Sequence, residues 1–253
     1  MSNSAYKPNV TLVIPAHNEE KYIGECLEHV LRNRDFLEII VIDNASTDKT
    51  REIVEKIARQ HMGINLRVVH EPKKGLVMAR QRGYLEAVKN SHCDIIAYVD
   101  ADTHMPEKWL AAVMHEFEKD PNLACLSGPY IYHDIPRWQQ ILIKVLYWRA
   151  LAMPVYWLVG YMATGANFAL RKNVLEKMEG FDTSIAFYGE DTNIARRAAK
   201  HGKVKFKPNF EMHLSGRRLK NQGVTKTGLV YMANYLSEVL FKKPATKEYK
   251  DYR

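Results

Sequence analysis

Two aspartates that could bind one metal ion, Asp100 and Asp102, directly follow an apolar segment at 95–99. The segment is short, uncharged and rich in β-forming residues, which predicts a buried strand. Residues i and i+2 of an extended chain project to the same side, so both carboxylates can reach one target. Two such carboxylates repel each other and are costly to desolvate, and a Mg²⁺ or Mn²⁺ ion that holds a diphosphate would relieve both effects. An alternative stays open: one aspartate caps the next helix, which starts near Pro106, and the other is solvated.

A second acidic pair, Glu190 and Asp191, follows Gly189 at the start of a predicted helix. An acid in the first turn of a helix is usually a stabilising charge, and these residues alone favour that interpretation. Beside a second carboxylate, however, the pKa of a carboxyl group rises toward that of a useful general base.

A lone histidine, His213, precedes two arginines, Arg217 and Arg218. A lone histidine is more often structural than a metal ligand, and both roles stay open here. The two arginines could neutralise a departing diphosphate, because guanidinium groups are bidentate donors.

Alternating strands and helices must position these residues. Apolar runs predict four strands, at 10–14, 37–42, 66–69 and 95–99. Helical patterns separate them with short connections, which predicts a parallel sheet covered on both faces and joined by right-handed crossovers. In such sheets ligands bind beyond the carboxyl ends of the strands. The polar clusters at 15–19, 43–48 and 100–102 all follow strands at that edge, and three clusters are much stronger evidence for a site than one aspartate pair.

The composition is that of a globular protein: 253 residues, 46% hydrophobic and 26% charged, enough for one large α/β domain. Three cysteines without a CxxC motif favour a reducing, cytoplasmic compartment and argue against a disulfide framework or a zinc site. The first residues, MSNSAYKPN, have no apolar core and are not expected to be a signal peptide. The net charge of +8 is concentrated at 217–253, and such a basic end could bind nucleic acid, acidic lipid or nucleotide phosphates. Beyond Lys242 a solvated basic tail has at least equal weight.

The most apolar stretch is 138–161. Its length raises a transmembrane segment, but Pro154 and the small and polar residues beyond it predict interrupted helices instead. Two interpretations stay open: helices at a membrane surface above the acceptor cleft, with three tryptophans suited to that place, or ordinary core helices. The helical spacing places five apolar side chains on one side of this stretch: Ile141, Val145, Trp148, Ala152 and Tyr156. We also expect a single strand over 124–132 and a helix over 228–241 whose apolar stripe packs on the domain or on a partner; the stripe comprises Leu229, Met232, Tyr235, Leu236 and Val239.

Seven segments in order resemble the successive motifs of family 2 glycosyltransferases: VTLVIPAHNEE, IIVIDNASTDKT, KGLVMARQRGY, IIAYVDADT, TGANFALRK, GFDTSIAFYGEDTNIARRA and FEMHLSGRR. The match covers roughly residues 9 to 218, and the joint pattern is specific although each piece is modest. Many members have Asp-Asp where this chain has Asp43-Asn44. The resemblance implies an α/β chain with a single GT-A domain: a mostly parallel, Rossmann-like central sheet with helices on both faces. We expect this domain at 9–218, with a nucleotide-binding half at 9–105 and an acceptor-side half at 106–218. A basic helical C-terminal extension would occupy 219–253.

The resemblance also implies a function: inverting, metal-dependent transfer of a sugar from a nucleotide-sugar, with UDP the commonest donor nucleotide, to an acceptor hydroxyl in glycoconjugate synthesis. The implied nucleotide-sugar site comprises Pro15, Ala16, Asn18, Glu19, Asp43, Arg80, Asp100, Ala101 and Asp102. The implied ligands of Mn²⁺ or Mg²⁺ are Asp102, Asp100 and His213. Asp191 would be the general base, Gly165, Ala166, Asn167 and Glu190 would lie on the acceptor and donor-sugar side, and Arg217 and Arg218 would contact the diphosphate.

The implied acceptor is a saccharide or a lipid-linked molecule, and the enzyme would be cytoplasmic, at the inner face of the membrane if 138–161 and the basic C-terminus contact lipid. A sugar nucleotidyltransferase is the alternative, although the acidic pair at 190–191 and the absence of a Gly-rich loop after the first strand argue against it. A nucleic-acid-binding module is disfavoured because the basic residues form no recognisable motif with aromatic side chains.

Overall fold

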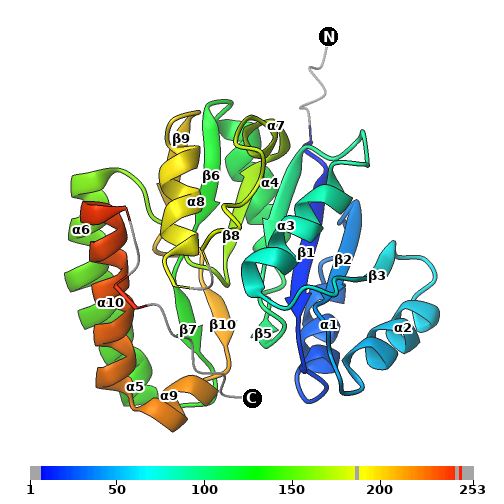
Figure 1. Ribbon diagram of the computed structural model, residues 1–253, viewed down its shortest axis with the longest axis horizontal. Helices are drawn as coiled ribbons and strands as arrows, with labels where there is room; N and C mark the ends of the chain where they lie inside the picture. The colour runs from blue at the N-terminus through cyan, green and yellow to red at the C-terminus, as the bar shows by residue number, and fades with distance from the viewer. Residues whose placement is uncertain (1–6, 186–187, 243–244, 247–253) are drawn as a thin grey trace.

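A seven-stranded sheet forms the centre of the molecule, and its strands follow the order β3-β2-β1-β4-β8-β6-β9 (Figure 1). The computed structural model describes residues 7–185, 188–242 and 245–246. The strands of this sheet are β1 (Val10–Ala16), β2 (Glu38–Asp43), β3 (Leu66–His70), β4 (Ile95–Tyr98), β6 (Leu123–Ser127), β8 (Phe168–Arg171) and β9 (Lys203–Phe206). Within it, β8 runs antiparallel to its neighbours β4 and β6, and the other pairings are parallel. The predicted α/β class with a mostly parallel sheet is confirmed.

Helices cover both faces of the sheet, as predicted. One face packs on α1 (Ile23–Leu31), α2 (Thr50–Gln60) and α4 (Trp109–Lys119). The other packs on α3 (Leu76–Ala87), α7 (Lys172–Lys177) and α8 (Glu190–Ala198). Successive side chains of a strand point to opposite faces. In β1, Leu12 and Ile14 therefore belong to the first core and Val13 to the second.

A smaller sheet of three strands lies beyond the carboxyl end of β4, in the order β5 (Thr103–His104), β10 (Met212–Leu214), β7 (Tyr130–Tyr132). The prediction of one strand over 124–132 is wrong, because β6 and β7 belong to different sheets. Gly128 and Pro129 separate them. A Cβ at Gly128 would lie 2.0 Å from the carbonyl oxygen of Phe210, so only glycine allows this close approach.

One continuous helix spans 137–159, made of α5 (Arg137–Leu142), a π-helix η1 (Ile143–Ala152) and α6 (Met153–Val159). The predicted break at Pro154 is wrong. In an α-helix the proline ring clashes with the carbonyl four residues earlier, but the turns of η1 are wider and its bonds reach five residues back. The helix is long and apolar enough to cross a membrane by length and composition.

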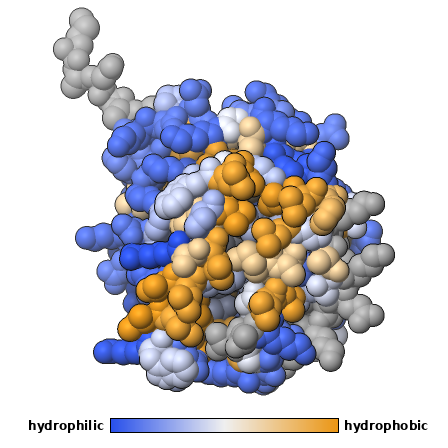
Figure 2. Space-filling view, turned by 90° about the vertical axis from the view of Figure 1, so that its left-hand side faces the viewer, coloured by the Kyte–Doolittle hydropathy of each residue, from blue (hydrophilic) through white to orange (hydrophobic). Residues whose placement is uncertain are grey.

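The wider turns of η1 also change which side chains of this helix face inward. Of the side chains predicted to share one side, Trp148 and Ala152 are buried, but Ile141 and Val145 are exposed. Apolar side chains of this helix and of α10 gather on one face of the molecule, where Figure 2 shows large orange patches. The core-helix interpretation of 138–161 therefore fails for its outer face. The exposed set comprises Trp138, Ile141, Leu142, Val145, Leu146, Leu151, Trp157, Leu158, Leu229, Leu236, Leu240 and Phe241, and we call it the apolar face.

Two helices follow β10, α9 (Arg217–Gln222) and α10 (Val224–Phe241), so the helix predicted at 228–241 is confirmed and begins earlier. The domain does not cover the whole predicted apolar stripe, because Leu229 and Leu236 are exposed, and packing of these two side chains on a partner stays a prediction. The buried side of α10 carries polar residues instead, among them Asn234 and Glu238. Glu238 faces inward because it accepts a hydrogen bond of 3.2 Å from Arg196 in α8. The predicted basic tail beyond Lys242 lies almost entirely outside the described residues.

Candidate active site

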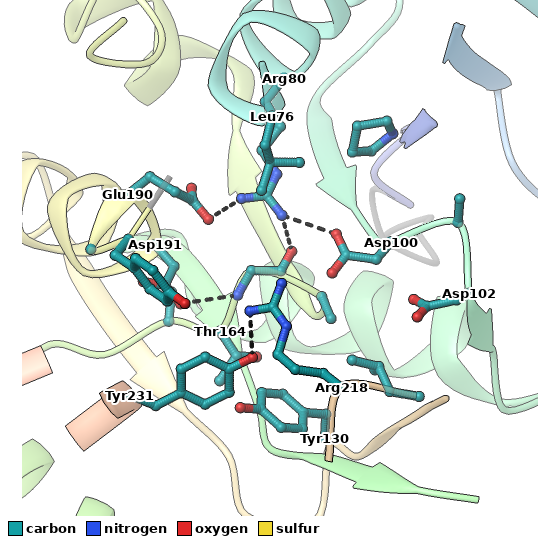
Figure 3. A pocket seen from close by; sticks show the side chains of 18 of the residues that line it. Leu76, Arg80, Asp100, Asp102, Tyr130, Thr164, Glu190, Asp191, Arg218 and Tyr231 are labelled. Carbon is teal, nitrogen blue, oxygen red and sulfur yellow. Dashed lines mark hydrogen bonds and ion pairs between the residues drawn. The ribbon is translucent and has the colours of Figure 1, made fainter. Parts of the chain in front are cut away.

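A cavity of about 540 Å³ opens at the carboxyl ends of β1 and β4, between the sheet and the walls formed by η1 and α10 (Figure 3). The structure brings together residues from every predicted motif, and the cluster at 43–48 contributes Asn44 rather than Asp43. The predicted site residues that line the cavity are Pro15, Ala16, Glu19, Arg80, Asp100, Ala101, Asp102, Gly165, Ala166, Glu190, Asp191, Arg217 and Arg218.

Arg80, on α3, joins the two acidic clusters at the base of the cavity. Its guanidinium is 3.1 Å from Oδ1 of Asp100 and donates to Oε1 of Glu190 and, at 2.7 Å, to the carbonyl of Gly165. Arg80 is completely buried, so these contacts fix the relative position of β4 and α8. A Cβ at Gly165 would lie 3.0 Å from both Arg80 and Glu190, which explains a glycine at this position.

Asp102 contacts a second arginine, Arg217, at the start of α9. Arg217 lies 3.1 Å from Oδ2 of Asp102, and its guanidinium stacks over the ring of Tyr22 with 4.7 Å to the ring centroid. Burial raises the pKa of Asp102 to about 7, although the charge of Arg217 opposes this rise. The carboxylate of Asp102 is therefore short of neutralising charge.

Asp100 and Asp102 fit a divalent cation. The carboxylate oxygens supplied by this pair are the donors that Mg²⁺ and Mn²⁺ prefer. Burial removes the solvation that stabilises the ionised carboxylate of Asp102, and the positive charge of a cation would stabilise it instead. The aspartates lie two and four residues beyond the end of β4, so this strand end positions them both.

Asp191 is the second residue of α8 and faces the cavity from the side opposite to Asp100 and Asp102 (Figure 3). Its Oδ2 accepts the backbone N–H of Gly165 at 3.2 Å, and its Oδ1 accepts that of Thr192 at 2.8 Å. Burial raises its pKa even though these hydrogen bonds lower it. Burial also raises the pKa of the adjacent Glu190 to about 7, against the influence of Arg80. Asp191 has the accessibility and the pKa direction that a general base needs.

Four predicted site residues do not line the cavity. Asn18 accepts the backbone N–H of Thr47 at 2.8 Å, and Asp43 is buried beside His70, 3.2 Å away. The buried amide of Asn167 instead serves the fold, because it donates to the carbonyl of Phe210 at 2.6 Å.

His213 is the fourth, and the structure does not bring it together with Asp100 and Asp102. It lies in β10 between Met212, which is buried, and Leu214, which lines the cavity. Alternate residues of a strand point to opposite faces, so His213 is exposed on the side away from the cavity. The expected histidine ligand is therefore absent from this arrangement of the described residues.

An aromatic wall of the cavity was missed by sequence reasoning. It consists of Tyr130, Tyr132, Tyr147, Trp148, Tyr188, Tyr231 and Tyr235. The OH of Tyr231 accepts a hydrogen bond of 2.9 Å from Arg218, which links the wall to the predicted diphosphate side. The spacing of Tyr231 and Tyr235, one helical turn apart, was the available signal.

The chain is similar to known glycosyltransferases in sequence and in fold. The model of the family described as Glycosyl transferase family 2 matches residues 11–179. The probable glycosyltransferase YdaM of Bacillus subtilis (strain 168) is 29% identical over 213 residues, covering 79% of this chain and 49% of that protein. This chain thus spans about half the length of that relative.

Two solved structures have a similar fold. The mannosyltransferase PcManGT from Pyrobaculum calidifontis, in complex with GDP-Man and Mn²⁺, has a TM-score of 0.71 at 22% identity, over 94% of this chain and 64% of that one. The glucosyl-3-phosphoglycerate synthase from Mycobacterium tuberculosis, in complex with Mn²⁺, UDP and phosphoglyceric acid, has a TM-score of 0.59 at 19% identity, over 93% of this chain and 78% of that one.

Proposed function

The chain belongs to glycosyl transferase family 2, and we propose that it transfers a sugar from a nucleotide-sugar to an acceptor hydroxyl with inversion of the anomeric centre. The GT-A fold predicted from the sequence is confirmed by the likeness to solved glycosyltransferases. The observation that carries the proposal is that the Asp100–Asp102 and Glu190–Asp191 pairs face one another across a single cavity. A carboxylate cluster for a metal-bound diphosphate and an accessible base opposite it are what such a transfer requires.

The donor is proposed to bind in the half formed by residues 9–105, along Pro15, Ala16 and Glu19. Asp100 and Asp102 would hold Mn²⁺ or Mg²⁺, whose chemistry there is to neutralise the diphosphate of the leaving nucleotide. Arg217 and Arg218 extend from α9 to the same side and add fixed positive charge for that diphosphate. UDP-sugars are the first donors to test.

The acceptor is proposed to bind in the half formed by residues 106–218, against the aromatic wall. Aromatic faces suit the apolar side of a sugar ring. Asp191 takes the proton of the attacking hydroxyl, while Arg80 holds Glu190 and so orients the start of α8. The rest of the chain, 219–253, is proposed as an extension that contributes Tyr231, Asn234 and Tyr235 to the acceptor side.

A lipid-linked acceptor at the inner face of a membrane is the proposed substrate class. The same helix that lines the cavity with Tyr147 and Trp148 carries the apolar face on its other side. Its exposed charges are cationic, since 137–159 contains no acidic residue, and anionic lipid attracts such a surface. The inner side of the helix packs on the domain, which supports a helix lying along the membrane over one crossing it.

A screen of nucleotide-sugars tests the proposal. With Mn²⁺ present, the correct donor should raise the unfolding temperature, because a ligand at 100 times its Kd stabilises by about 2.7 kcal/mol. Slow hydrolysis of that donor should release a nucleoside diphosphate. Release of pyrophosphate from a nucleoside triphosphate and a sugar phosphate would instead support a sugar nucleotidyltransferase, and a lack of response to all donors would contradict both.

A further inference from the structure

Three imidazole rings form a stack outside the cavity, where α1 meets β5. The ring of His104 stacks on that of His29, with 4.3 Å between centroids and 5° between planes. On its other side it stacks on His133, with 3.8 Å and 17°. Protonated rings in contact would repel, so this arrangement needs neutral imidazoles.

A carboxylate completes this cluster. Glu25 lies one helical turn before His29 on α1, so both side chains project from the same side of the helix. Oε1 of Glu25 is 3.2 Å from Nε2 of His104. One ligand atom from each of Glu25, His29 and His104 lies within 4.8 Å of the other two. Zinc ligands at bond lengths of about 2.0–2.1 Å lie roughly 3.3 Å apart in a tetrahedron. The separation between Oε1 of Glu25 and Nε2 of His104 already matches this distance.

We propose that Glu25, His29 and His104 form a second metal site, for an ion of the zinc class. Two imidazoles and one carboxylate favour Zn²⁺ and similar transition metals, whereas the all-oxygen pair Asp100–Asp102 favours Mg²⁺ or Mn²⁺. The absence of a CxxC motif argues against a thiolate zinc site and does not bear on these ligands. An imidazole nitrogen binds a metal ion in the plane of its ring, so the ring of His29, which is parallel to that of His104, must turn out of the stack when the ion binds. The bound ion then connects α1 to β5, and stacking on His133 holds the ring of His104 in place.

The charges around the cluster are mixed. Glu28 lies near His29, and Asp134 lies near His133; both add negative charge, which a divalent cation requires. Arg32 and Lys220 oppose them, at His29 and at His133 respectively. The site is distinct from the donor cavity, because none of its three ligands lines that cavity. It therefore does not depend on the proposed transferase function.

Zinc titration of the metal-free full chain by calorimetry tests the site. We expect one Zn²⁺ per chain and a rise in unfolding temperature on saturation. The variant Glu25→Gln should bind zinc at least about 100-fold more weakly, since even partners of metal ligands contribute 10–100-fold. Glu25 is exposed, so this variant folds like the wild type and carries the test even if His29→Ala does not fold. Co²⁺ in place of Zn²⁺ should give the visible absorption of a tetrahedral complex.

Two controls separate this site from other binding. His201→Ala removes an exposed histidine outside the cluster and should leave zinc affinity unchanged. Asp102→Asn should also leave it unchanged, while it weakens Mn²⁺-dependent donor binding. The proposal is overturned if Glu25→Gln binds zinc like the wild type, if His201→Ala or Asp102→Asn abolishes binding, or if no zinc binds.

Discussion

Arg217 donates two hydrogen bonds, of 2.8 and 2.7 Å, to the carboxylate of Glu19, from which it is 198 positions distant in the chain. The pair joins the turn after β1 to the start of α9, and so places both ends of the predicted domain at the metal side of the cavity. Both terminal nitrogens of the guanidinium bond Glu19, and the one nearest Asp102 is therefore shared between the two carboxylates. Asp102 is therefore the carboxylate on which a cation should have the greatest effect.

Replacing Asp102 should abolish metal-dependent donor binding. Asp102→Asn keeps the shape but removes the charge, and the loss of a ligand should weaken donor affinity in Mn²⁺ at least about 100-fold. Calorimetry with UDP, with Mn²⁺ or with a chelator, measures this. Asp35→Asn, an exposed aspartate paired with Lys7, is the matched control and should bind like the wild type. Equal UDP affinity with and without Mn²⁺ in the wild type would refute the metal role.

Replacing Asp191 should affect chemistry and leave donor binding intact. Asp191→Asn cannot accept the hydroxyl proton, so turnover should fall by about 10²–10⁴-fold while donor affinity stays near the wild-type value. Transfer rates and donor Kd, measured once a donor is known, decide this. A near wild-type rate would exclude Asp191 as the base and make Glu190→Gln the next variant to test.

Removing Arg80 should destabilise the fold. Arg80→Met leaves the buried carboxylate of Glu190 without its partner, and breaking a buried ion pair in this way costs about 3–5 kcal/mol. Urea denaturation gives the free energy of unfolding. The double variant Arg80→Met/Glu190→Gln should recover a large part of this loss, because the two effects are coupled. Strict additivity would show that the pair does not interact.

Low pH should reduce the contribution of Glu116 to the free energy of unfolding. Burial raises its pKa, but hydrogen bonds of 2.6 Å from Lys205 and Lys207 outweigh burial and lower it to about 2. A depressed folded-state pKa gives stability that is fully present above the unfolded value of about 4.3 and is lost as the pH falls toward 2. Glu116→Gln should therefore unfold in less urea than the wild type at neutral pH. The gap should narrow markedly by about pH 3, and a gap independent of pH would contradict the assignment.

The apolar face should bind lipid. Trp157 and Leu158 are 70% and 86% exposed, and the variant Trp157→Glu/Leu158→Glu should lose co-sedimentation with anionic vesicles. Met62, just after α2, is an exposed apolar residue outside the apolar face, so the control variant Met62→Glu should still co-sediment. Wild-type protein that stays in the supernatant at low salt would favour a soluble acceptor.

The sheet and the cavity could be predicted because the carboxyl ends of parallel strands must meet at one edge. The sequence pattern fixed neither the pairing of short strands nor their orientation. His213 was misplaced for this reason, since one step along β10 decides which face a side chain occupies. Periodicity finds the apolar stripe of α10 but does not say whether the domain or a partner covers it. Glu25, His29 and His104 are separated in sequence, and only the fold brings them together.

The position of β8 has a consequence for the order in which the protein folds. This strand lies between β4 and β6, and it is made after both. Residues 9–105 can pair β3, β2, β1 and β4 among themselves as they leave the ribosome, but β4 then keeps an open edge. β6 and β9 cannot join that sheet until β8 inserts antiparallel between the two parts. Such distant pairings are slow to form, and an unpaired strand edge invites aggregation. Insertion of β8 is therefore the step that a folding chaperone would have to protect.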